Sequence, residues 1–110
     1  MGVGQAVTMT DSPVVHMVLV RWKPGFARAD LDELTALAKA FSESIPGVLA
    51  VQCGPSTSPE GLEGGFDWAL VVTFASSSAR DEYLPHPAHE PVKRLISQGA
   101  DEVVVFDVDA

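Results

Sequence analysis

The chain has 110 residues, 46% of them hydrophobic and 20% charged, which is the size and composition of one domain with a buried core. Fifteen acidic and seven basic side chains give a formal net charge of −8, so nucleic acid and anionic membrane surfaces are disfavoured as partners. Cys53 is the single cysteine, which excludes an internal disulfide and a four-cysteine zinc site. Basic nucleic-acid modules and disulfide-stapled secreted scaffolds are thereby excluded.

The N-terminal segment has none of the features of a targeting sequence. It has no basic region followed by an apolar core, and no apolar run approaches the ~20 residues that a membrane helix needs. We therefore expect a flexible N-terminal arm over residues 1–12, a single domain over residues 13–110 and a cytoplasmic location.

The first half of the domain predicts a strand, a helix and a second strand. Residues 14–22 are rich in β-branched and long apolar side chains and end at Lys23-Pro24-Gly25. Apolar residues at spacings of three and four predict a helix over residues 27–44, which Pro46-Gly47 ends. A strand over 48–53 and an irregular Gly-, Pro- and Ser-rich loop over 54–65 follow.

The second half predicts a strand, two short helices and a last strand. The strand covers residues 66–74, and Ser78 is the expected N-cap of a helix that reaches Leu84. Two prolines separate it from a helix over 88–98, and the last strand covers 102–108. The order β-α-β-β-α-β is typical of an α+β, ferredoxin-like sandwich with a four-stranded antiparallel sheet.

The predicted strands are apolar on both faces. His16, Val18, Val20 and Trp22 share one face of the first strand, while apolar residues also occupy the other face. Two helical segments can cover only one face of a sheet, and a half-solvated sheet would alternate apolar with polar residues. A second copy of the same sheet is the simplest cover, so we expect a homodimer.

Few residues of the sequence are suited to acid–base chemistry. His16 lies within an apolar strand, either as a structural core histidine or as a neutral imidazole placed for proton transfer. Tyr83, His86 and His89 cluster where prolines interrupt the helices, and His86 either anchors the loop or contributes to a site. The spacing of His86 and His89 could serve a metal, but no third ligand is supplied nearby, so no metal is expected.

Aromatic side chains accompany His16 on its face of the predicted sheet. Trp22, Trp68 and Phe74 form either ordinary core or the wall of a pocket for a flat apolar ligand.

The run Tyr83-Leu84-Pro85-His86-Pro87-Ala88-His89 resembles the stress-responsive A/B barrel domain (Dabb) family. The segments 16–25, 45–48, 65–68 and 72–74 also resemble this family, so the likeness covers roughly residues 14–108. The resemblance implies a ferredoxin-like sandwich whose sheets pair into a dimeric α+β barrel.

The resemblance also implies candidate functions. A plant member of the family closes a linear polyketide by aldol condensation without a cofactor, and its catalytic residues correspond here to His16, Tyr83 and His89. Trp22, Trp68, Phe74 and His86 would line the ligand pocket, although Trp68 replaces a pocket histidine of that enzyme. We therefore expect a cofactor-free cyclase acting on a small aromatic or polyketide-like ligand. A non-enzymatic, stress-related ligand-binding barrel and a cofactor-independent monooxygenase are the alternatives.

Overall fold

A computed structural model describes residues 12–110 of the protein, so the expected N-terminal arm lies outside the described residues except for residue 12. Strands and helices alternate as the sequence pattern predicts. In chain order the elements are β1 (Val14–Trp22), α2 (Arg28–Lys39), α3 (Phe41–Ser44), β2 (Val48–Pro55), β3 (Trp68–Phe74), α4 (Ser77–Tyr83), α5 (Glu90–Gly99) and β4 (Ala100–Asp109).

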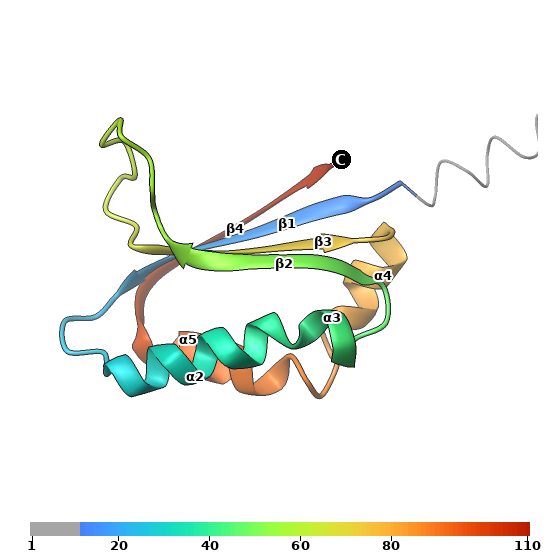
Figure 1. Ribbon diagram of the computed structural model, residues 1–110, viewed down its shortest axis with the longest axis horizontal. Coiled ribbons are helices and arrows are strands. Elements are labelled where there is room, and N and C mark those ends of the chain that lie inside the picture. The colour runs from blue at the N-terminus through green and yellow to red at the C-terminus, as the bar shows by residue number, and fades with distance from the viewer. Residues whose placement is uncertain (1–11) are drawn as a thin grey trace, which may run out of the picture.

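The four strands form one antiparallel sheet in the order β2-β3-β1-β4. Its centre is marked by Val18 of β1, which pairs with Leu70 of β3 on one side and Val105 of β4 on the other. All the helices lie on the same face of the sheet, and the other face is open (Figure 1). The predicted ferredoxin-like α+β sandwich is therefore confirmed.

The first predicted helix is divided in two. Ala40 separates α2 from α3 with φ −79° and ψ −6°, so the prediction of one unbroken helix over residues 27–44 was wrong at this residue. The carbonyl of Ala40 accepts hydrogen bonds from the Ser44 hydroxyl at 2.8 Å and from the Glu43 backbone N–H at 3.0 Å. This local tightening turns α3 toward β2, and it leaves no trace in apolar spacing.

Other element boundaries also differ from those predicted, among them the starts of α4 and α5. The N-cap of α4 is Ser76 rather than Ser78, because the Ser76 hydroxyl accepts the backbone N–H of Ala79 at 3.1 Å. Helix α5 begins at Glu90, which makes His89 its N-cap instead of a residue within the first turn. The histidine therefore lies at the junction between loop and helix.

A glycine allows α4 to approach the turn before β2. Gly47 has φ +86°, and a Cβ built there would lie 2.5 Å from the Cβ of Ala79. Its carbonyl also accepts the backbone N–H of Ala75 at 2.9 Å. Gly47 thus fixes the end of the sheet nearest Tyr83 against the helix that carries this tyrosine.

The two faces of the sheet differ in burial. On the helix side, alternate residues of β1 and β3 are buried and pack with α2, α3 and α5 into one core. On the open side the intervening residues are only half-buried, and Phe106 of β4 is 59% exposed. The predicted two-sided apolar sheet is therefore present, with one side lacking a cover among residues 12–110.

Candidate functional site

A cavity of about 310 Å³ lies between the sheet and the helices α4 and α5. It contains all three residues predicted to be catalytic: His16 from β1, Tyr83 from α4, and His89 at the start of α5. We call it the histidine cavity. Its other lining residues, mostly aliphatic, are Val18, Leu70, Leu84, Val92, Lys93, Ile96, Ser97, Val103 and Val105.

His16 is buried and held by a carboxylate from the neighbouring strand. Its Nδ1 lies 2.7 Å from Oδ1 of Asp107, which is its direct partner in the β1–β4 register. Since a carboxylate oxygen accepts, Nδ1 carries the proton and Nε2 is left for other interactions. The second oxygen of Asp107 accepts a hydrogen bond from Nη1 of Arg80 at 3.0 Å. Arg80 and Asp107 therefore fix the orientation of the His16 ring.

The ring of His89 is fixed by a backbone carbonyl. Its Nδ1 lies 2.9 Å from the oxygen of Leu84, and because a carbonyl can only accept, Nδ1 is the protonated nitrogen. Burial is the largest effect on the pKa of His89 and lowers it. The Leu84 hydrogen bond raises this pKa, and the positive charge of Lys93 lowers it by a smaller amount. The neutral ring therefore presents Nε2 as its basic nitrogen near neutral pH.

Tyr83 lies between the two histidines. Its ring centroid is 4.2 Å from that of His89 and 5.8 Å from that of His16. The side chain is fully buried, and its hydroxyl has no hydrogen-bond partner among the described residues. Burial raises its pKa, so the hydroxyl keeps its proton and can donate. A buried donor without a partner lowers the stability of the fold unless a ligand or water accepts a hydrogen bond from it.

These groups together can move a proton at a carbonyl compound. The basic Nε2 of His89 can accept a proton, and the hydroxyl of Tyr83 can donate a hydrogen bond to an oxygen that gains negative charge. Most of the lining is aliphatic, and both interactions are stronger where water is excluded.

The remaining predicted ligand-binding residues lie outside the histidine cavity. Phe74 is fully buried behind it, 4.9 Å from Tyr83 between ring centroids. Trp22 and Trp68 line a separate cleft of about 470 Å³ between α2 and the ends of β2 and β3, which we call the tryptophan cleft. His86 anchors its own loop, because its Nδ1 accepts the backbone N–H of Ala88 at 3.0 Å.

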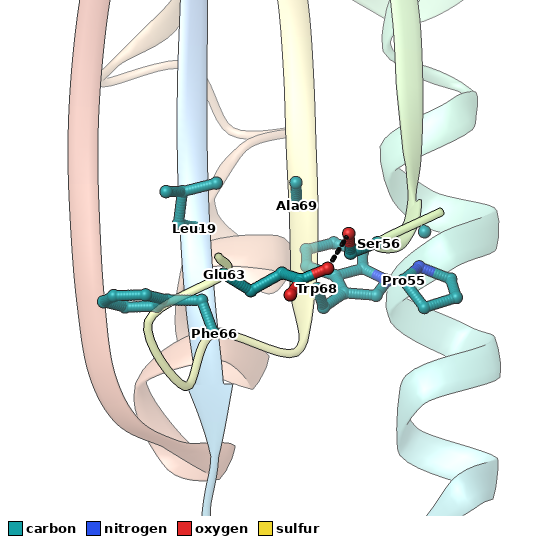
Figure 2. A pocket seen from close by; sticks show the side chains of 8 residues that line it. Leu19, Pro55, Ser56, Glu63, Phe66, Trp68 and Ala69 are labelled. Atoms are coloured by element: carbon teal, nitrogen blue, oxygen red, sulfur yellow. Dashed lines mark hydrogen bonds between the residues drawn. The ribbon is translucent and has the colours of Figure 1, made fainter. Parts of the chain in front are cut away.

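A third hollow, of about 210 Å³, lies on the open face beneath the loop that joins β2 to β3 (Figure 2). Leu19, Ala69 and Phe66 contribute apolar surface to it, and Glu63 accepts a hydrogen bond from the Ser56 hydroxyl at 2.6 Å. No histidine lines this hollow, so it lacks the acid–base groups of the histidine cavity.

Residues 12–110 contain neither a cluster of metal-ligating side chains nor a membrane-spanning helix. No group of three or more His, Cys, Asp or Glu side chains in that range is arranged to hold a metal ion. Over the same range, none of the helices has both the length and the apolar character to cross a bilayer.

Asp107, Arg80 and Lys93 belong to the site or support it, and the sequence interpretation did not identify them. Asp107 does carry a signal, because an isolated aspartate within the apolar segment 103–108 needs a partner when it is partly buried. Arg80 and Lys93 resemble ordinary helix-surface residues, and only the packing of α4 and α5 against the sheet shows their position.

The fold and the cavity define a class: small ferredoxin-like α+β domains with one open sheet face and histidines beneath the helices. Within this class, the profile of the Stress responsive A/B Barrel Domain family (Dabb) matches residues 14–110. The chain therefore belongs to the Dabb family, and the predicted family resemblance is confirmed.

Two characterised relatives are similar in sequence. The stress-response A/B barrel domain-containing protein HS1 of Arabidopsis thaliana is 30% identical over 95 residues, which are 86% of this chain and 87% of that protein. Olivetolic acid cyclase of Cannabis sativa is 23% identical over 94 residues, 86% of this chain and 93% of the cyclase.

Two solved structures have the same fold. A protein of unknown function from Jannaschia, described as dimeric and ferredoxin-like, superposes with a TM-score of 0.80 at 22% identity, covering 89% of this chain and 99% of its own. Hydroxynitrile lyase from Passiflora edulis also gives a TM-score of 0.80, at 20% identity over 91% of this chain and 94% of the lyase.

Proposed function

We propose that the protein is a cofactor-free enzyme that performs acid–base chemistry at a carbonyl group, of the polyketide-cyclase or aldol type. The observation that supports this most strongly is the buried hydroxyl of Tyr83, which has no hydrogen-bond partner among residues 12–110. Its ring packs against His89, whose Nδ1 is hydrogen-bonded to Leu84. Among residues 12–110 the Tyr83 hydroxyl is a donor without an acceptor. Nε2 of His89 is a base without a proton. A substrate with a carbonyl and an adjacent C–H bond satisfies both.

The reaction follows from these two groups. Nε2 of His89 removes a proton from the carbon next to the carbonyl, while Tyr83 donates a hydrogen bond to the carbonyl oxygen as an enolate forms. The enolate carbon then attacks a second carbonyl of the same molecule, so that one C–C bond forms and an alkoxide results. Protonated His89 returns the proton to this alkoxide, which completes an aldol closure without loss or gain of atoms.

His16 has a different role from His89. Because Asp107 holds its Nδ1, His16 can direct only Nε2 into the cavity, where it orients the substrate or the second carbonyl. Olivetolic acid cyclase and hydroxynitrile lyase, both similar to this chain, are named as a cyclase and a lyase, which supports an enzymatic reading of the cavity. A purely ligand-binding barrel is the alternative that the next experiment separates.

Hydrogen–deuterium exchange next to the carbonyl of an aryl methyl ketone, followed by NMR in D₂O, measures proton abstraction without the natural substrate. We expect the protein to accelerate exchange, and His89→Asn to lower this acceleration by about 100-fold, within the usual range for a general base. Asparagine retains an N–H for the Leu84 carbonyl but has no basic nitrogen. His86→Asn is the matched control and keeps the rate. Equal rates with and without wild-type protein, despite ligand binding, would favour the binding barrel.

We also propose that the working unit is a homodimer in which two open sheet faces pack together. The half-buried apolar side chains of β1 and β3 and the exposed Val104, Phe106 and Val108 of β4 support this assembly. The dimeric description of a similar fold supports it as well.

The dimer is tested by light scattering coupled to size exclusion. Phe106→Asp places a charge on the open face, and we expect it to yield monomers at micromolar concentration. Val105→Asp is the matched control, because Val105 is equally exposed, at 58% against 59%, but faces the histidine cavity. Monomeric wild-type protein, or identical behaviour of the two variants, would contradict the proposal.

A further inference from the structure

Three polar side chains follow one side of α5 along the rim of the histidine cavity. His89, Lys93 and Ser97 are each four residues apart, so they lie above one another on the helix, and all three line the cavity. We call them the α5 polar row. The opposite rim is formed by Val103 and Val105 of β4, which are apolar. The cavity therefore has one polar and one apolar side at its mouth.

Lys93 is the only lysine or arginine among the residues that line the cavity. It stands out in a chain with a formal charge of −8, whose overall field repels anions. Its ammonium lies 3.3 Å from Oε2 of Glu90, but both side chains are more than half exposed. Such a surface ion pair is weak, so an anionic ligand can replace Glu90 at little cost.

The spacing of the row limits where a ligand's charge can lie. One helical turn separates His89 from Lys93, which corresponds to a rise of about 6 Å. If the carbonyl group of a ligand contacts Tyr83 and His89, an anionic group a few bonds away in the same ligand would thus reach Lys93. The four aliphatic CH₂ groups of lysine can lie along the apolar lining while the ammonium stays at the mouth.

We propose that the histidine cavity selects carbonyl compounds that also carry a carboxylate, and that Lys93 is the residue that determines this specificity. The reaction of such a ligand rests on the function proposed above, but its charge selection does not.

The test compares 4-acetylbenzoate with 4-acetylbenzamide, which have nearly the same shape and differ in charge. Binding is measured by NMR titration of the full chain, following the ring signals of His16 and His89. We expect wild-type protein to bind the carboxylate about fivefold more tightly than the amide, and Lys93→Gln to remove this preference. Lys93→Arg retains the preference, and Glu90→Gln increases it by releasing the ammonium.

Lys39→Gln is the matched control, since it changes the net charge equally at a lysine of α2 that does not line the cavity. Equal loss of preference in Lys39→Gln and Lys93→Gln would reduce the effect to overall charge and overturn the inference. Equal wild-type affinity for both ligands at the histidines would overturn it too, while leaving the proposed function intact. Absence of any histidine shift with either ligand would count against both.

Discussion

The histidine cavity and the tryptophan cleft lie on the same side of the sheet, the first beneath α4 and α5 and the second against α2, and they differ in how their polar groups are hydrogen-bonded. In the tryptophan cleft the charged groups already have partners: Arg28 pairs with Asp32 at 3.1 Å, and Asp67 accepts the backbone N–H of Trp22 at 2.9 Å. In the histidine cavity the Tyr83 hydroxyl has no partner among residues 12–110. A buried polar group without a partner is therefore the feature that separates the histidine cavity from the tryptophan cleft.

Among variants of the two regions, Tyr83→Phe is expected to have the largest effect on the ketone exchange rate. Loss of the donor should lower the ketone exchange rate by about 100-fold, as for the removal of one oxyanion donor. The free energy of unfolding should stay the same or rise by about 1 kcal/mol, because the hydroxyl has no hydrogen-bond partner in the described part of the chain. Chemical denaturation measures the second quantity. A large loss of stability with unchanged rate would mean that Tyr83 is structural.

A smaller effect is expected from Asp107→Asn. Without the carboxylate, His16 is no longer held with its proton on Nδ1, and we expect about a tenfold lower rate together with a changed tautomer in ¹⁵N NMR. Arg80→Gln should produce a weaker form of the same change, since it acts through Asp107. Asp81→Asn is the control, because Asp81 contacts Arg80 on its exposed side. An unaltered His16 spectrum in Asp107→Asn would exclude the positioning role.

The pH dependence follows from the lowered pKa of His89, whose largest cause is burial; the Leu84 hydrogen bond opposes this lowering, and the charge of Lys93 adds to it by a smaller amount. The folded state binds this proton less readily than the unfolded state, so stability from the neutral ring is present above the unfolded pKa of about 6.5 and is lost as pH falls through the folded pKa. The acid limb of the rate profile should therefore lie below pH 6.5. Lys93→Gln removes a charge that lowers the pKa of His89, so this limb should move to higher pH. Movement to lower pH would contradict the assignment of the limb to His89.

The smallest effect on activity is expected in the tryptophan cleft. Trp22 stacks on Phe26 with ring centroids 4.5 Å apart, so Trp22→Leu should lower the free energy of unfolding by about 1–2 kcal/mol. The exchange rate should stay within about twofold, because Trp22 does not line the histidine cavity. A large loss of rate in a stable Trp22→Leu protein would show that the two regions act as one site.

Periodicity alone determined the α+β class, the strand order along the chain and the two-sided apolar sheet, because side chains alternate at every second residue of a strand. The same alternation placed His16 on one face with Trp68 and Phe74, and the structure shows that this is the face covered by the helices. The motif around Tyr83 and His89 resembles the Dabb family, and this resemblance predicted a catalytic role for both residues.

Only the tertiary structure decided which of these residues share a cavity. Tyr83 and His89 meet His16 because α4 and the start of α5 pack over that end of β1, whereas Trp22 and Trp68 lie near the other end of the sheet. Asp107 is 91 residues from His16 in the chain and becomes its partner through the β1–β4 register. Such pairings depend on how strands align and helices pack, and contacts between distant segments leave no local pattern in the sequence.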